Sequence, residues 1–130
     1  MSDQTASVLL VDDETHICYV IGRKLEQAGY QVHQANDGEE GLQQALEHQP
    51  DLIISDNQMP IMTGVALAHA LTRHPETKDI PVLMLTARNF TIANRKIAGT
   101  NVVAVLSKPF SPRDILRQVD ELMATHVSAD

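Results

Sequence analysis

Four short apolar runs in this sequence each end in residues that can do chemistry. These residues are three carboxylates, a hydroxyl and an amine: Asp12, Asp13, Asp56, Thr86 and Lys108. If the runs are parallel strands of one sheet, their carboxyl ends meet at one edge, which is where open α/β sheets bind ligands. Such a set suits a divalent cation together with a phosphoryl group, because a hard cation offsets the repulsion among the carboxylates.

The consecutive acids Asp12 and Asp13 are candidates to hold Mg²⁺. This ion prefers oxygen ligands and keeps several waters, so one carboxylate can bind the ion while its neighbour binds a metal-bound water. The plainer explanation is a solvated acidic turn or a cap for the helix that follows. Taken alone, the dipeptide favours that plainer explanation.

Asp56 is more informative, because it directly follows a buried run, where a lone carboxylate is unfavourable. A carboxylate can act as a nucleophile on phosphorus. Lys108 is suited to pair with Asp56 when the site is empty and with a phosphoryl oxygen when it is filled, and the Thr86 hydroxyl can donate to the same oxygen. Each also has an ordinary explanation as a turn residue, a surface lysine or a β-branched strand residue. Their joint position at one sheet edge favours the functional interpretation.

Strand-like and helix-like segments alternate five times along the chain. The strand-like segments lie near residues 6–11, 31–35, 52–56, 81–86 and 102–107. Between them, apolar residues recur at spacings of three and four, which is typical of helices with one buried face. The runs 8–11, 52–55 and 82–85 are continuously apolar apart from Ser55 at the end of the second, which predicts central strands covered on both faces. The alternation predicts an α/β fold with a doubly wound parallel sheet and right-handed crossovers.

Several expected helices carry signals at their ends. Gly29 lies where a left-handed cap ends the first helix. Asp37 is a cap for the second helix, and Ser111 with Asp114 three residues later starts the last one. The fourth helix, expected at about 90–98, has the weakest apolar stripe.

Bulk composition limits the class of protein. With 130 residues and 43% apolar content, residues 1–130 are expected to form a single domain. A net charge of −7 and an aromatic content of 3% argue against direct binding to nucleic acid. No apolar run is long enough to span a membrane, and the N-terminus lacks the order of a secretory signal. A single cysteine, Cys18, suits the cytoplasm.

Taken together, the motifs resemble the receiver domain of bacterial response regulators in two-component signalling, and single-domain chemotaxis regulators in particular. The resemblance covers about residues 6–124 and rests on Asp12-Asp13-Glu14, Asp56 with Met59-Pro60 and Gly64, Thr86-Ala87, and Lys108-Pro109-Phe110. It implies a flavodoxin-like, five-stranded parallel sheet in the order 2-1-3-4-5, with helices on both faces.

The resemblance also implies a reaction. Asp56 would be the phosphoacceptor, taking a phosphoryl group from a phosphohistidine on a sensor histidine kinase or a histidine phosphotransfer protein. Asp13 and Asp56 would ligate Mg²⁺ together with the backbone carbonyl of Gln58, and Asp12 would act through water. Thr86 and Lys108 would bind the phosphoryl oxygens.

The sequence departs from the family pattern at the residues expected to respond to phosphorylation. On phosphorylation Thr86 would move inward, and an aromatic residue three positions before the lysine usually fills the vacated space. Here that position is Val105, so either Leu106 or Phe110 takes part of that role, or the switch is mainly a shift of loop and helix. The segment 99–103 is also longer by about two residues than the common turn, which is expected to alter the loop before the fifth strand.

Two further positions are expected to tune autodephosphorylation. Gln58 and Arg88 lie two residues after the acceptor and two after Thr86, so they flank the path of a hydrolytic water. An amide and a guanidinium there predict a phosphoryl lifetime that differs from the common one.

Two rival functions remain at this point. A phosphatase of the haloacid-dehalogenase type would need a second Asp two residues after the nucleophile, where this chain has Gln58, and it would need a cap domain. A degenerate receiver would bind partners without being phosphorylated, which the complete acidic set with Thr86 and Lys108 argues against. We therefore expect a signalling protein rather than a metabolic enzyme. With no output domain in these residues, it would pass its signal by contact with a downstream protein.

Overall fold

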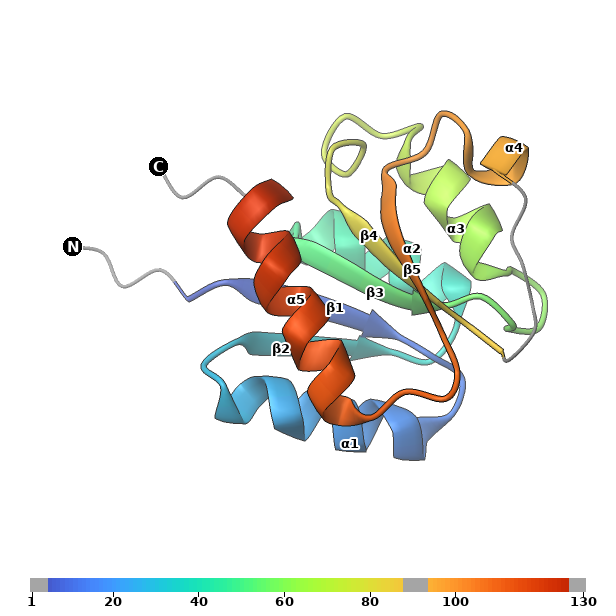
Figure 1. Ribbon diagram of the computed structural model, residues 1–130. Helices are drawn as coiled ribbons and strands as arrows, with labels where there is room; N and C mark the ends of the chain where they lie inside the picture. Colours follow the sequence, from blue (N-terminus) through green and yellow to red (C-terminus); the bar gives the residue numbers. More distant parts are fainter. Residues whose placement is uncertain (1–4, 88–93, 127–130) are drawn as a thin grey trace.

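Five parallel strands form one sheet with helices on both of its faces (Figure 1). The computed structural model describes residues 5–87 and 94–126. In chain order the elements are β1 (Ser7–Val11), α1 (Thr15–Gln27), β2 (Gln31–Ala35), α2 (Gly38–His48), β3 (Leu52–Asp56), α3 (Gly64–Leu71), β4 (Val82–Thr86), α4 (Asn94–Ile97), β5 (Val102–Ser107) and α5 (Pro112–His126). The sheet order is β2-β1-β3-β4-β5, which confirms the doubly wound, flavodoxin-like α/β fold expected from the sequence.

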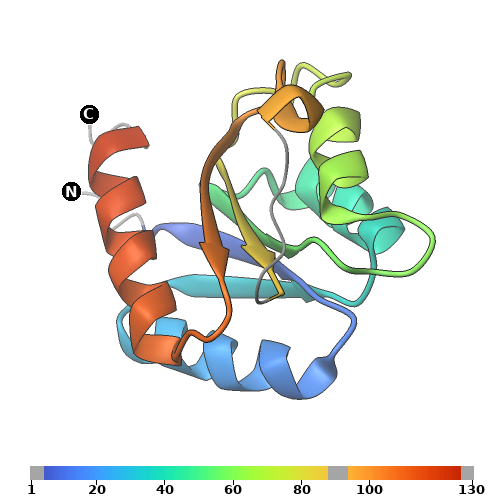
Figure 2. The same ribbon diagram turned by 45° about the vertical axis from the view of Figure 1, so that its right-hand side comes forward.

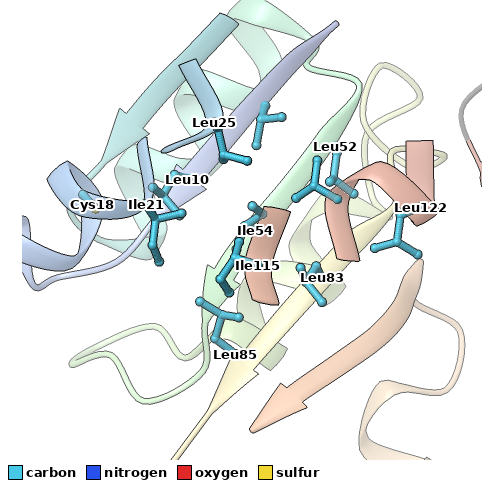
Figure 3. Close-up of a cluster of buried hydrophobic side chains, with 12 residues drawn as sticks. Leu10, Cys18, Ile21, Leu25, Leu52, Ile54, Leu83, Leu85, Ile115 and Leu122 are labelled. Carbon is cyan, nitrogen blue, oxygen red and sulfur yellow. The ribbon is translucent and has the colours of Figure 1, made fainter. Parts of the chain in front are cut away.

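Two apolar cores lie on opposite faces of the sheet. Alternate strand residues point to opposite faces, so Val8 and Leu10 face α1 and α5, whereas Leu9 and Val11 face α2 and α3. Figure 3 shows the first of these cores, and Figure 2 shows α1 and α5 together on one side of the sheet. The prediction that β1, β3 and β4 are central strands is therefore confirmed.

Helix ends follow the sequence signals closely. The Asp37 side chain accepts the backbone N–H of Glu40 at 2.8 Å. Ser111 and Asp114 exchange hydrogen bonds of 2.9 and 3.2 Å between side chain and backbone, which is a capping box. Of the helix expected at 90–98, only Asn94–Ile97 is helical, and the earlier part of that prediction lies outside the described residues. Within the described ranges, no helix combines the length and the apolar character needed to cross a membrane.

A bulge in β5 absorbs part of the longer segment noted at 99–103. Val82 pairs with Val102, but Leu83 pairs with Ala104, so Val103 is an extra residue on β5. The altered geometry thus reaches into the strand itself and is not confined to the preceding loop. Beyond the bulge the register brings Ser107 opposite Thr86, which sets the position of the residue that follows.

Candidate functional site

The five candidate residues lie at the same edge of the sheet, as the sequence predicts. Val11 pairs with Ser55, so Asp12 and Asp56 follow side by side at the ends of β1 and β3. Asp56 pairs with Leu85, the residue before Thr86, on β4. Lys108 follows directly after β5, and its backbone N–H donates to the Thr86 carbonyl at 3.0 Å. In Figure 1 the arrowheads of these strands point to this edge.

The three carboxylates form a compact cluster. Asp12, Asp13 and Asp56 each place one carboxylate oxygen within 4.8 Å of the other two. Asp12 is buried, Asp56 is partly buried and Asp13 is exposed. The Asp12 carboxylate is oriented by the backbone N–H of Glu14, which donates to its Oδ1 at 2.9 Å. Three acidic oxygens with one open side form a hard donor set, which fits Mg²⁺.

Burial and mutual repulsion raise the pKa of two of these acids. Burial raises the pKa of Asp56 to about 7, and the charges of Asp12 and Asp13 add to the effect, while the Lys108 charge opposes it. Burial likewise raises the pKa of Asp12 to about 6, against the hydrogen bond from Glu14. Asp12 and Asp56 therefore bind protons more tightly than free carboxyl groups do unless a positive charge takes the proton's place, which is the behaviour expected of a cation site.

Thr86 has a hydroxyl that lacks a partner. Its side chain is 1% exposed, and within the described part of the chain its Oγ1 forms no hydrogen bond. Leaving a buried hydroxyl unpaired costs about 1–3 kcal/mol. Another buried threonine, Thr77, by contrast donates its hydroxyl to the Leu71 carbonyl at 2.7 Å. An unpaired donor at the end of β4 is thus available to an oxygen that enters the site.

Lys108 is not paired with Asp56, which differs from the pairing expected for an empty site. Among the described residues, the one ion pair within 4.0 Å joins Arg117 and Asp114. The Lys108 side chain is exposed, so its ammonium remains solvated at the end of a flexible stem. Its charge still acts on the cluster, because it offsets part of the rise in the pKa of both Asp56 and Asp12.

Gln58 makes a contact that the sequence did not reveal. Its side-chain Oε1 accepts the backbone N–H of Ala87 at 3.1 Å, so it connects the segment after β3 to the segment after β4. This bond occupies the backbone donor that directly follows Thr86. The Gln58 carbonyl, expected as a metal ligand, belongs to the same segment as Asp56. Arg88, the other position expected to affect hydrolysis, lies outside the described residues.

Asn57 and Gly64 fix the segment that follows Asp56. The buried Asn57 accepts the Val65 N–H with its side chain at 3.1 Å and the Gly64 N–H with its carbonyl at 3.1 Å. A Cβ on Gly64 would lie 2.6 Å from the Asp56 carbonyl oxygen, so only glycine permits this approach. Asn57 carried a signal only as an ordinary turn residue, and its role depends on α3 packing against the end of β3.

The three residues expected to respond to phosphorylation differ in how they pack. Val105 is 45% exposed. Leu106 and Phe110, the two suggested substitutes for the missing aromatic, pack instead against the core formed with α1 and α5. Their packing favours the alternative in which loop and helix shifts carry the switch.

Comparisons with known proteins place these features in context. Residues 8–120 match the family described as the response regulator receiver domain. The chain is 36% identical over 119 residues to the phosphate regulon transcriptional regulatory protein PhoB of Pseudomonas aeruginosa, covering 90% of this chain and 51% of that protein. It is 40% identical over 118 residues to the DNA-binding dual master transcriptional regulator RpaA of Synechocystis, covering 89% of this chain and 48% of that protein.

A solved structure matches over almost its whole length. The chemotaxis response regulator CheY4 of Vibrio cholerae has a TM-score of 0.83 and 34% identity, covering 92% of this chain and 99% of that one. The chain described here spans about half the length of the curated regulators it matches.

Proposed function

Because the chain belongs to the response regulator receiver family, we propose that it accepts a phosphoryl group on Asp56 in a Mg²⁺-dependent reaction. The donor is a phosphohistidine on a sensor histidine kinase or a histidine phosphotransfer protein. Receivers of this family are signalling proteins of two-component systems and not metabolic enzymes. The proposal is carried by one observation: Asp56 lies within the three-carboxylate cluster and pairs with the strand residue before Thr86, whose buried hydroxyl forms no hydrogen bond with any described residue.

The acidic cluster is proposed to bind Mg²⁺ and so to keep the nucleophile, Asp56, ionised. Asp13, Asp56 and the Gln58 carbonyl are the proposed protein ligands of Mg²⁺, with Asp12 acting through a metal-bound water. When bound, the ion supplies positive charge that keeps these acids ionised and screens the incoming phosphoryl oxygens from them. Burial and the acidic neighbours raise the pKa of Asp56, and a bound cation would offset both effects by favouring the ionised form, so the carboxylate would then be free to attack.

Transfer needs little further chemistry from the chain. An Asp56 oxygen forms a bond to phosphorus as the bond from phosphorus to the donor's imidazole nitrogen breaks, and the electron pair leaves with that nitrogen. The Thr86 hydroxyl and the Lys108 ammonium bind the phosphoryl oxygens. Lys108 is exposed and unpaired with Asp56, so it can turn toward the incoming charge without breaking an existing ion pair.

The switch is proposed to begin at Thr86. Donation from its hydroxyl to a phosphoryl oxygen would satisfy a buried group that now has no partner, and this draws the end of β4 toward Asp56. The adjacent Ala87 N–H is held by Gln58, so that hydrogen bond is the first contact expected to change. The signal then passes to a downstream protein by contact, through loop and helix shifts near β5. Gln58 and Arg88 are proposed to set the rate of autodephosphorylation.

Treatment with phosphoramidate and Mg²⁺ tests the proposal directly. The expected result is a gain of one phosphoryl mass in the wild-type chain and none in Asp56→Asn. Asp79→Asn, which alters an exposed acid outside the cluster, is the matched control and should be phosphorylated like the wild type. Lack of modification by phosphoramidate or acetyl phosphate would indicate a receiver that only binds partners. Steady phosphate release from many substrates would indicate a phosphatase.

A further inference from the structure

Ile61 stands out as a large apolar side chain in full contact with solvent. It is 99% exposed, compared with 60% for Tyr19 and 45% for Val105. It lies on the loop between β3 and α3, which projects from the carboxyl edge of the sheet in Figure 1. One exposed apolar residue is common on protein surfaces, so exposure alone carries no conclusion.

The backbone at Ile61 is strained. Its φ is 71°, in the left-handed region, and the Met62 N–H donates to the Pro60 carbonyl at 2.7 Å. A hydrogen bond from i+2 to i with positive φ at the middle residue is the classic γ-turn, which is rare and strained. Isoleucine is β-branched and among the residues least suited to this conformation. Glycine or asparagine would suit the turn better, so this position holds a residue that the local fold does not favour.

The residues around Ile61 hold the turn in place. Met59 is 5% exposed and belongs to the core under α2 and α3. Met62 packs against Gly38 so closely that a Cβ there would lie 2.7 Å from it. Asn57 accepts the Met59 N–H at 3.0 Å on the other side. With both flanks anchored, the backbone of the turn fixes the direction in which the Ile61 side chain leaves the chain.

We propose that Ile61 is a docking anchor for the histidine-phosphorylated donor protein, filling a small apolar depression beside the donor's phosphohistidine. This inference rests on the proposed function. The reacting carboxylate, Asp56, is five residues earlier on the same braced segment. Any protein that brings a phosphohistidine to Asp56 must cover this edge of the sheet. A preformed, exposed apolar side chain loses little conformational freedom on binding, which makes it an efficient contact.

Two phosphodonors separate docking from chemistry. Ile61→Asn suits the left-handed backbone but removes the apolar contact, whereas Ile61→Leu keeps the apolar contact and serves as the control. With phosphoramidate, both variants should be phosphorylated at the wild-type rate. With the sensor kinase of the same genome that phosphorylates the wild-type chain fastest, Ile61→Asn should lose roughly tenfold in kcat/KM, and Ile61→Leu should lose about twofold or less.

The outcomes are distinct. Failure of phosphoramidate to modify the wild-type chain would overturn the proposed function itself. Equal rates for Ile61→Asn and the wild type with the kinase would overturn the docking role and leave the proposed function standing. The docking role would also fall if the wild type accepted the group from phosphoramidate but from no histidine-phosphorylated protein, or if Ile61→Asn only dissolved a dimer of this chain at an unchanged transfer rate.

A stability measurement excludes a purely structural role. Relief of the strained φ should leave Ile61→Gly at least as resistant to urea as the wild type, while its transfer rate from the kinase falls like that of Ile61→Asn. Loss of stability in both variants, in step with their loss of transfer, would assign Ile61 to the fold and contradict the proposal.

Discussion

The two sides of the sheet's carboxyl edge are built differently. On the β1–β3 side the strand residues before the acids are almost fully buried, and the acids themselves are held close together. On the β5 side none of the strand residues is fully buried, and the described residues between β4 and β5 include just one short helix, α4 (Asn94–Ile97). The proposed reaction centre thus follows the most deeply buried strands, and the proposed readout lies beside the less buried strand.

The two sides also differ in how many energetically unfavourable polar groups they contain. Among its described residues, the acidic side has two carboxyl groups with raised pKa values and one buried hydroxyl without a hydrogen-bond partner. Each of these lowers stability in the absence of a ligand, and each would be relieved by a cation or a phosphoryl group. Among the residues described on the β5 side, no carboxyl group has a raised pKa and no buried hydroxyl lacks a partner. A shift of the β5 side therefore depends on its lower burial alone.

Removal of one acid should have the largest effect on the acidic side. Asp13→Asn is expected to weaken Mg²⁺ binding by about a hundredfold, because it removes a charged oxygen ligand from a set of three. Isothermal titration calorimetry measures the change, with Asp79→Asn as the control of equal charge. Equal affinities of the two variants would show that the cluster is not the metal site.

One substitution made on two strands tests the difference in packing. Val8→Ala removes two methyl groups from a side chain that is 0% exposed and should lower the free energy of unfolding by about 2 kcal/mol. Val105→Ala makes the same change on β5, at a side chain that is 45% exposed, and should cost about 0.5 kcal/mol or less. Urea unfolding gives both values, and similar losses would contradict the contrast between the two sides.

The raised acid pKa values predict how stability changes with pH. The folded protein binds the Asp56 and Asp12 protons more tightly than the unfolded chain does, so these groups favour folding at low pH. That contribution is lost as pH rises from about 4 through about 7. Without Mg²⁺, Asp56→Asn should therefore gain about 1–2 kcal/mol over the wild type at pH 8, and the gain should shrink toward pH 4.

Urea titrations in EDTA at several pH values measure this difference between variant and wild type. Taking the difference removes the contribution of groups that shift the other way, such as His33, whose pKa is lowered by burial and by His48. Saturating Mg²⁺ should stabilise the wild type at pH 8 more than it stabilises Asp56→Asn. A gain that grows toward low pH would contradict the direction of the pKa shifts.

Two buried threonines provide the smallest and most selective test. Thr86→Val removes a hydroxyl without a partner and should stabilise the protein by about 1 kcal/mol. Thr77→Val removes a hydroxyl that donates to the Leu71 carbonyl and should destabilise it by about the same amount. Changes of opposite sign in the free energy of unfolding would support Thr86 as an unpaired donor that is available to a phosphoryl oxygen. Equal losses of stability would show that its hydroxyl already has a hydrogen-bond partner.

Much of the fold and of the acidic cluster could be predicted from the sequence. Apolar runs without alternation identified the central strands, and the rule that parallel strands end at one edge brought Asp12 and Asp56 together. Caps at Asp37 and Ser111 were predictable because each is made within one turn of helix. Local chemistry and topology were sufficient for these features.

Other features depend on contacts between segments that are distant in the sequence. The bond from Ala87 to Gln58 joins residues 29 positions apart, and the bulge at Val103 is defined only by the pairing of β5 with β4. The γ-turn at Ile61 contradicts local preference, so residue type predicts against it. Lys108 is exposed and makes no ion pair with Asp56, because its ammonium is strongly hydrated, and sequence spacing does not describe this competition with water.

The position of the modified residue tests most directly whether Asp56 is the phosphoacceptor. After treatment with phosphoramidate and Mg²⁺, borohydride reduction converts an aspartyl phosphate to homoserine, and peptide mass spectrometry locates the converted residue. We expect homoserine at position 56 alone, and none when EDTA replaces Mg²⁺. Homoserine at Asp12 or Asp13, or equal conversion at position 56 in EDTA, would contradict it.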